Sequence, residues 1–212
     1  MNKVNAVMVG GLFDENGISA FARPVLFGTA GDAMRDALPD AVETCFFAHD
    51  DRESAVAGAQ DIALDAANRF ASLAALPESE HVLVLAAPFA LAEEDALFHL
   101  AETHLNTGYG VSVLSAEQQG FDAEGQPLPR DSRCYAAMLK KALASGADTL
   151  DGLVAAAVAA GAQKGIAITN KIYVICDGTA AFMAQVEMMQ RVNYGLIKKG
   201  VQIFDLTSTY IA

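Results

Sequence analysis

Four short, mainly apolar runs constrain the fold of this chain more than any other feature of its sequence. The runs are Val4–Gly10, Val42–Ala48, His81–Leu85 and Gly110–Leu114. Consecutive apolar residues are typical of parallel strands covered on both faces, because both sides of such a strand are buried. Helix-like segments separate the runs. This alternation predicts an α/β fold with a mostly parallel sheet between two helical layers, a three-layer α/β/α arrangement.

The remaining segments supply the predicted helices and two further strands. Apolar spacings of three and four residues, with Pro and Gly at the ends, predict the helices. They are Gly31–Leu38, Asp51–Leu76, Glu93–Leu105, Cys134–Ala144, Thr149–Ala160 and Thr179–Lys199. Short strands are expected at Gly165–Thr169 and Ile172–Cys176, and a polar surface loop over Gly120–Arg133.

The composition indicates a globular protein and argues against two kinds of partner. Of 212 residues, 53% are hydrophobic and 19% are charged, a balance that excludes intrinsic disorder. The net charge of −12 argues against a nucleic-acid partner. No apolar run approaches the ~20 residues that span a membrane, and no signal peptide is recognisable. Cys45, Cys134 and Cys176 form no CxxC pair, so reduced core thiols in a cytoplasmic protein are expected.

The first apolar run ends in Gly10-Gly11, which makes this turn the natural wall of a ligand crevice. Ligands of doubly wound sheets bind at the carboxyl ends of central strands, and glycines permit close approach of a ligand to the backbone. A tight structural turn would use the same two glycines. The following Asp14 and Glu15 suit a triphosphate poorly; they either hold a cation or form a solvated acidic loop.

Two groups of histidines and acids are weaker candidates for chemistry. His49-Asp50-Asp51 follows the second run and is interpreted either as a metal or acid–base cluster or as a turn leading into a helix whose first turn favours acids. His99 and His104 lie five residues apart on a predicted helix, which is not the four-residue spacing of a helical metal site.

The end of the chain resembles a known family. The segment Gln190–Ile211 reads QRVNYGLIKKGVQIFDLTSTYI, and the residues that carry the resemblance are Arg191, Asn193, Gly200, Val201, Ile203, Asp205, Thr209, Tyr210 and Ile211. It resembles the junction between the two halves of bacterial bifunctional GlmU enzymes, N-acetylglucosamine-1-phosphate uridyltransferase/glucosamine-1-phosphate acetyltransferases. The resemblance implies a nucleotide-diphospho-sugar transferase (Rossmann-like) domain over residues 1–200, and an extended tail over 201–212 that is similar to the start of a left-handed β-helix.

Weaker matches extend this resemblance to the candidate nucleotide site. Arg23-Pro24-Val25-Leu26 is similar to the family's segment that carries a phosphate-binding Lys, although Pro24 stands at the Lys position and Arg23 comes one residue early. Asp177-Gly178 is similar to an acid-Gly pair of the family. The nucleotide-binding candidates are therefore Gly10, Gly11, Arg23 and Gly178.

In the same alignment, the family's two metal ligands are replaced in this chain. Pro88 and Ala180 fall at the two metal-ligand positions, and neither side chain can hold Mg²⁺, which prefers oxygen ligands. The uracil-reading segment corresponds to Gln60-Asp61-Ile62-Ala63. Replacement ligands would have to come from other acids. The candidates are Asp14, Glu15, Asp50 and Asp177.

Two functions follow from this pattern. The first is a catalytically silent nucleotidyltransferase-like domain that binds a ligand or a partner. The second is a divergent sugar-1-phosphate nucleotidyltransferase with a rebuilt Mg²⁺ site. The expected partners are a nucleotide or nucleotide sugar, and either a second copy of the chain or a downstream β-helix domain; neither a nucleic acid nor a membrane is expected.

Overall fold

The structure is a computed structural model that describes residues 3–14, 16–25, 28–90, 94–116, 136–144, 147–169 and 174–175. The predicted loop over 120–133, the helix over 179–199 and the tail over 201–212 lie outside the described residues. So do Cys134 and Cys176. Cys45 is a free, buried thiol, as expected, and its burial raises its pKa to about 11.

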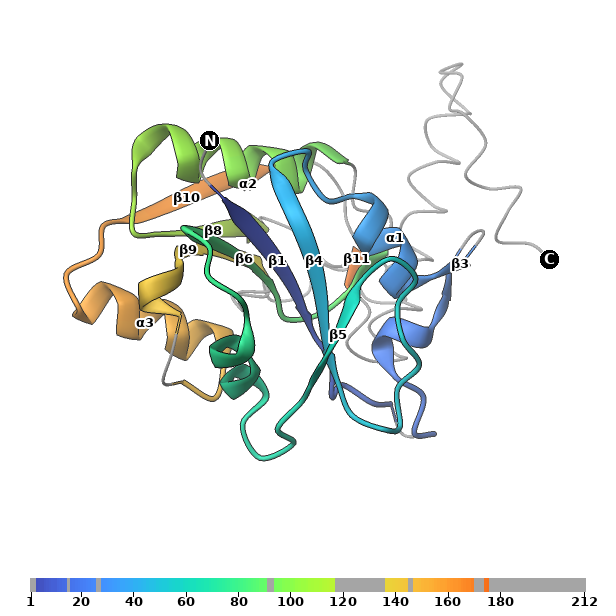
Figure 1. The fold of residues 1–212 in the computed structure, drawn as a ribbon. Coiled ribbons are helices and arrows are strands. Elements are labelled where there is room, and N and C mark those ends of the chain that lie inside the picture. The colour runs from blue at the N-terminus through green and yellow to red at the C-terminus, as the bar shows by residue number, and fades with distance from the viewer. Residues whose placement is uncertain are drawn as a thin grey trace, which may run out of the picture.

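A seven-stranded sheet forms the centre of the molecule, in the order β10-β8-β9-β6-β1-β4-β5 (Figure 1). In that order the strands are Lys164–Thr169, Val111–Ala116, Ala136–Lys140, His81–Leu85, Val4–Val9, Val42–His49 and Gln60–Ala63. All pairings are parallel except those of β9, which runs antiparallel to both β6 and β8. The mostly parallel α/β sheet predicted from the sequence is therefore confirmed.

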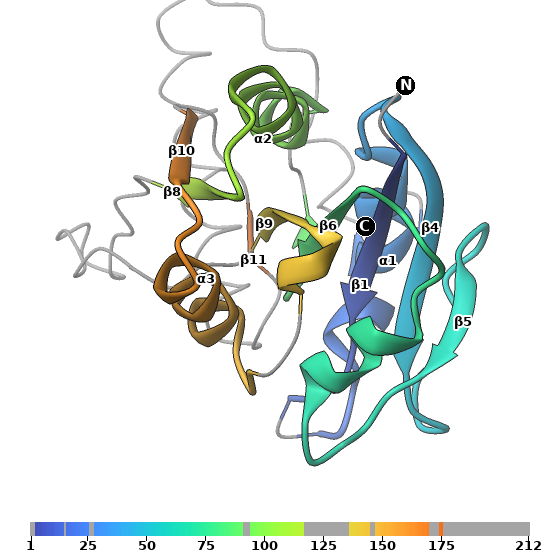
Figure 2. The ribbon, with the colours of Figure 1, turned by 60° about the vertical axis from the view of Figure 1, so that its left-hand side comes forward.

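Helices cover both faces of this sheet, as the turned view shows (Figure 2). The helix α1 (Ala30–Asp36) and the longer α2 (Glu94–Thr107) pack on one face. The 3₁₀ helix η2 (Arg69–Ala75) and α3 (Leu150–Ala159) pack on the other. The short elements are η1 (Ala20–Ala22), η3 (Lys141–Leu143) and the antiparallel pairs β2 (Pro24–Val25) with β3 (Gly28–Thr29) and β7 (Phe89–Ala90) with β11 (Val174–Ile175).

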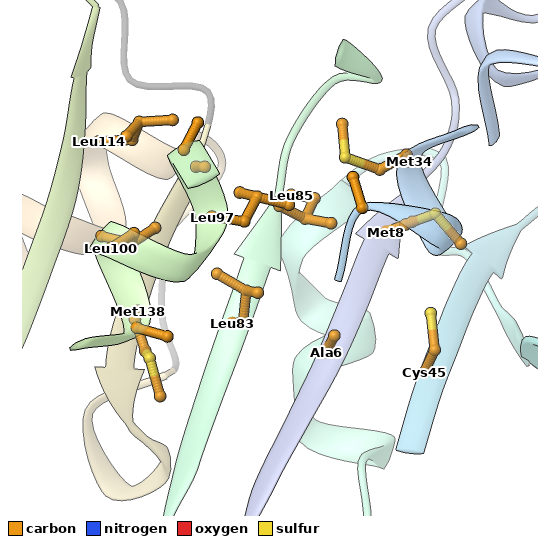
Figure 3. Close-up of a cluster of buried hydrophobic side chains, with 14 of the residues drawn as sticks. Ala6, Met8, Met34, Cys45, Leu83, Leu85, Leu97, Leu100, Leu114 and Met138 are labelled. Atoms are coloured by element: carbon orange, nitrogen blue, oxygen red, sulfur yellow. The ribbon is translucent and has the colours of Figure 1, made fainter. Parts of the chain in front are cut away.

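The side chains of the central strands divide between two cores. Successive residues of a strand point to opposite faces, so Met8 of β1 faces α1 and α2 while Val9 faces η2 and α3. In the first core, Leu83 of β6 lies with Leu100 of α2 and Met138 of β9 (Figure 3). Both faces of the sheet are buried, which explains why the strands have continuous apolar sequences.

Local side-chain contacts determine where two of the predicted helices begin. The Thr29 hydroxyl accepts the Asp32 N–H while the Asp32 carboxylate accepts the Thr29 N–H, a reciprocal cap at the start of α1. Thr149 caps α3 through the N–H of Gly152. These caps satisfy amides that have no partner inside the helix.

The long helix predicted over residues 51–76 is wrong. The chain instead turns at Gly58, which has a φ of 79°, and residues 60–63 pair with β4 as the edge strand β5. Only its last part is helical, and Asn68 caps this part, η2, by accepting the amides of Phe70 and Ala71. Alanine at helical spacing favours a helix weakly, and pairing with an open sheet edge outweighs that preference.

The helix predicted over residues 134–144 is also wrong, because residues 136–140 form β9 in the middle of the sheet. The notable consequence concerns the four apolar runs, which were expected to form neighbouring strands of one sheet. The β8 strand belongs to the same sheet as β1, β4 and β6, but β9 separates it from β6. The helices α1, α2 and α3 and the strand β10 are confirmed close to their predicted positions.

Candidate functional site

The topology creates a candidate site outside the carboxyl end of β1. From β1 the chain moves to β4 and β5 on one side, and then crosses to β6 on the other side. Open α/β sheets bind ligands at such a reversal of strand order. β1 ends at Val9, so Gly10 and Gly11 lie at this point, as the sequence predicted.

Arg69, the first residue of η2, spans the reversal point. Its Nε donates to the carbonyl of Gly10 at 2.6 Å, and its Nη2 donates to the carbonyls of Val9 at 2.7 Å and Ala86 at 2.9 Å. One guanidinium thus joins the end of β1 to the residue that follows β6. Burial lowers the pKa of Arg69, while the nearby charge of Glu53 opposes that shift. The side chain stays a cation, because guanidinium does not lose its proton in proteins.

Glu53 brings a buried carboxylate to the same turn. Its Oε2 accepts the N–H of Gly11 at 2.8 Å and its Oε1 accepts the hydroxyl of Ser19 at 2.5 Å. Hydrogen bonds to an ionised carboxylate are about twice as strong as those between neutral groups. The residue is only 7% exposed, so these two donors take the place of the water that an exposed carboxylate would bind.

The two glycines are required by this close contact. A Cβ on Gly10 would lie 2.2 Å from Oε2 of Glu53 and 2.7 Å from the carbonyl of Ala48. Gly11 has a φ of +80°, and a Cβ there would lie 2.8 Å from Cδ2 of Leu64. The glycine pair predicted that a ligand approaches the backbone here. The approaching group is a carboxylate of the chain itself.

The structure brings together Asp14 and Arg23, one predicted as a metal ligand and the other as a phosphate ligand. Oδ2 of Asp14 lies 2.9 Å from Nη2 of Arg23, and the two side chains are 2% and 8% exposed. Oδ1 of Asp14 accepts the amides of Asn16 and Ile18 at 2.8 and 2.9 Å. Asp14 is therefore not the solvated loop acid of one interpretation; it holds the loop after β1 in shape.

The acids after β4 form a surface turn. Asp50 accepts from the amide and the guanidinium of Arg52, and these hydrogen bonds hold the pKa of Asp50 below its usual value. The Nε2 of His49 lies 3.1 Å from Asp61 on β5, while Asp51 is exposed. The turn expected at this position is present, but it leads to a further turn and β5 rather than to a helix.

The structure shows no metal site among the residues it describes. In those parts of the chain, no three His, Cys, Asp or Glu side chains lie close enough to share an ion. Pro88 is buried just beyond β6. The other metal and nucleotide candidates, Glu15, Asp177 and Gly178, and the aligned Ala180 lie outside the described residues.

A buried network of polar side chains near the amino ends of β6 and β8 was missed by sequence reasoning. Nδ1 of His81, the first residue of β6, lies 3.0 Å from Nε2 of His104 on α2. Nδ1 of His104 lies 3.0 Å from the hydroxyl of Ser112 on β8. Neutral imidazoles, each with one N–H donor, satisfy both contacts. Nε2 of His81 lies 3.6 Å from Glu80, which is beyond hydrogen-bond distance.

His81 and His104 are both held neutral. Burial, and then the charges of His81 and Lys140, lower the pKa of His104 to about 4. Burial is also the main cause that lowers the pKa of His81. His99, whose five-residue spacing from His104 does not fit a helical metal site, is half exposed beside Glu102.

A pocket of about 520 Å³ lies at the amino edge of the sheet, away from the turn after β1. It is formed between α2 and the connection from α1 to β4. Apolar side chains, with the half-exposed Phe98 among them, and several acids line it. They include Leu38, Pro39, Leu105, Asp36, Asp40 and Glu102.

Sequence reasoning located the turn but missed the two residues that occupy it. Glu53 and Arg69 lie within the segment taken as a helix, 42 and 59 positions from the glycines they contact. One signal was available. Arg69 is a lone arginine just before the buried pair Phe70 and Leu73, and a cation at the edge of a core is usually paired.

The sheet topology defines the class of the domain: it has the α/β fold of the nucleotide-diphospho-sugar transferases. No protein-family model and no curated protein sequence matches the chain. No helix in the described ranges is long and apolar enough to cross a membrane.

Solved structures share this fold at low sequence identity. An rv0371c homologue from Mycobacterium sp. strain JC1 matches with a TM-score of 0.63 and 10% identity, over 89% of this chain and 98% of that one. The 2-C-methyl-D-erythritol 4-phosphate cytidylyltransferase of Thermus thermophilus matches with a TM-score of 0.55 and 15% identity, over 89% and 100%. The bifunctional IspDF of Campylobacter jejuni matches with 0.53 and 13%, over 79% of this chain and 50% of its own length.

Proposed function

We propose that this chain is a nucleotidyltransferase-fold domain that has lost nucleotidyl transfer and binds a ligand or a protein partner instead. The observation that carries the proposal is Glu53. Its carboxylate accepts hydrogen bonds from the amide of Gly11 and the hydroxyl of Ser19, at the point where sheets of this topology bind ligands. A nucleotide phosphate at the same position would meet a buried negative charge. Like charges in a poorly hydrated site repel strongly.

The remaining charges of the turn support the same conclusion. Asp14 and Arg23 pair with each other, so the acid is not offered to a metal ion and the cation is not offered to a phosphate. The side chain of Pro88 supplies no oxygen ligand beyond β6. Nucleotidyl transfer needs a bound metal to neutralise developing charge. A relationship to GlmU enzymes, which rests on residues 190–211, is part of this proposal.

The direct test is an assay of pyrophosphate release. The protein is mixed with Mg²⁺, N-acetylglucosamine-1-phosphate and uridine triphosphate, and then with cytidine triphosphate and 2-C-methyl-D-erythritol 4-phosphate. We expect no release above the rate without protein. The loss of several kcal/mol of metal stabilisation lowers the rate tenfold for every ~1.4 kcal/mol. Turnover at about 1 s⁻¹ or faster, as enzymes typically show, would refute the proposal.

A divergent sugar-1-phosphate nucleotidyltransferase is the second candidate. Asp50 favours it, because its partner Arg52 is 66% exposed and such surface ion pairs are weak. Mg²⁺ could therefore replace Arg52 at the end of β4. Under this hypothesis Asp50→Asn abolishes pyrophosphate release, whereas the silent domain has no activity to lose.

For the binding role, we propose the acidic pocket beside Phe98 as a partner surface. A lining of apolar and acidic side chains suits a partner segment that carries both apolar and basic side chains. A second copy of the chain and a downstream β-helix domain remain the proposed alternatives. Light scattering measures the mass in solution, and a Phe98→Ser variant tests the pocket. If the protein self-associates through this surface, the substitution shifts its mass toward the monomer.

A further inference from the structure

We propose that the turn after β1 is a binding site for a small oxyanion, and that the carboxylate of Glu53 is its built-in occupant. The amide of Gly11 and the hydroxyl of Ser19 form the site, and the guanidinium of Arg69 lies nearby. A carboxylate or phosphate group from outside binds there when Glu53 leaves. This inference rests on the proposed loss of catalysis, because it explains what has taken the place of a ligand.

The contacts of Glu53 have the form of a bound ligand. Each carboxylate oxygen meets one donor, the Gly11 amide for Oε2 at 2.8 Å and the Ser19 hydroxyl for Oε1 at 2.5 Å. Two donors of this kind suit the paired oxygens of a carboxylate or a phosphate equally well. Both come from the segment between β1 and η1, while the carboxylate comes from the segment beyond β4. The donors and the acceptor are therefore separate parts of the chain.

The backbone of the turn is shaped for this occupant. Any side chain on Gly10 would collide with Oε2 of Glu53, because its Cβ would lie 2.2 Å from that atom. Gly11 adopts a φ of +80°, a conformation that residues with a Cβ rarely adopt. A strand can end without a glycine at positive φ and without a second glycine before it. The glycine pair is needed to bring an amide close to a buried anion.

Arg69 supplies a fixed positive charge. Three carbonyls, those of Val9, Gly10 and Ala86, hold its guanidinium in place without any contribution from Glu53. The charge therefore stays when the carboxylate is removed. An empty site would contain two hydrogen-bond donors and a nearby cation, with no anion to balance them. Such a site attracts an anion from solution.

A tethered carboxylate competes strongly with any free anion. A group held on the same chain acts at an effective concentration that reaches the millimolar range or above. The natural protein should therefore bind inorganic phosphate and pyrophosphate weakly. Removal of the carboxylate should strengthen binding at least tenfold.

The experiment compares Glu53→Ala with Asp50→Ala and the unmodified protein. Asp50→Ala removes the same charge from the same edge of the sheet without touching Gly11 or Ser19. Thermal unfolding is measured with increasing sodium phosphate, pyrophosphate and formate, in the absence of Mg²⁺ and at constant ionic strength. We expect a saturable rise in the melting temperature for Glu53→Ala only. Formate is included because it restores the missing carboxylate group itself.

A second substitution tests the donors. Adding Ser19→Ala to Glu53→Ala should weaken phosphate binding at least tenfold, because one of the two hydrogen bonds is lost. If Glu53→Ala folds poorly, the same anions should raise the folded fraction, since a ligand that binds only the folded state shifts the equilibrium. The proposal is overturned if phosphate and formate leave Glu53→Ala unchanged, folded or not, or if Asp50→Ala gains the same response.

The outcome is independent of the catalytic test. Pyrophosphate release by the unmodified protein would refute the loss of catalysis whatever the variants bind. Absence of anion binding by Glu53→Ala would refute the built-in occupant even if the protein proves inactive.

Discussion

Acidification should destabilise this protein through one buried histidine. His104 is fully buried, and its pKa is lowered from 6.5 to about 4 by burial and by the charges of His81 and Lys140. The unfolded chain takes up a proton near pH 6.5, whereas the folded chain resists protonation down to about pH 4. Stability is therefore intact above pH 6.5 and is lost as the pH falls from 6.5 toward 4.

The size of this loss follows from the two pKa values. The full difference of about 2.5 units corresponds to about 3 kcal/mol of unfolding free energy, at ~1.36 kcal/mol per unit. Between pH 7.5 and pH 5.0 the same linkage gives a loss of about 2 kcal/mol. Lowering of the pKa of His81, mainly by burial, acts in the same direction.

Urea unfolding at pH 7.5 and pH 5.0 measures this loss. His104→Gln lowers the absolute stability, but it should remove about 2 kcal/mol of the difference between the two pH values, because glutamine does not titrate. His99→Gln is the matched control. It lies on the same helix but is half exposed, and should keep the full difference. Equal losses in His104→Gln and the unmodified protein would show that His104 is not held neutral by the fold.

Three further predictions concern stability and are checked by urea unfolding at pH 7.5. Leu100→Ala leaves a cavity between α2 and the sheet and should cost about 2–5 kcal/mol; a loss under ~1 kcal/mol would mean that the core collapses to fill it. Thr29→Ala removes the reciprocal cap with Asp32 and should cost about 1 kcal/mol, and an unchanged midpoint would show that water replaces the cap. Gly11→Ala should cost about 1–2 kcal/mol for its positive φ, plus the contact with Leu64, and no loss would mean that the turn has another conformation.

The sequence predicted the strands that are buried on both faces and failed at those defined by long-range pairing. Val4–Val9 and His81–Leu85 are apolar apart from Asn5 and His81 because helices cover both sides, and that signal is local. Ala136–Lys140 reads AAMLK, a set of good helix formers, and becomes a strand only because β6 and β8 offer it two edges. A single sequence does not reveal those edges.

The candidate site divides in the same way. Gly10 and Gly11 were identified because a glycine pair after a buried strand has a local conformational meaning. Glu53 and Arg69 were missed because their roles arise only when distant segments meet at the end of β1. Asp14 was considered as a metal ligand, and nothing in the sequence shows that Arg23 neutralises it.

The antiparallel strand β9 also has a consequence for how the molecule assembles. Among the described strands, it alone joins β5-β4-β1-β6, built from the first part of the chain, to β8 and β10. The strand β8 cannot join this sheet until β9, which comes later in the chain, has paired with β6. We therefore expect two cooperative units, with the amide hydrogens of β1 and β4 exchanging with solvent more slowly than those of β8 and β10. During synthesis, the part of the sheet formed by β1, β4, β5 and β6 can therefore form before β9 has paired with β6.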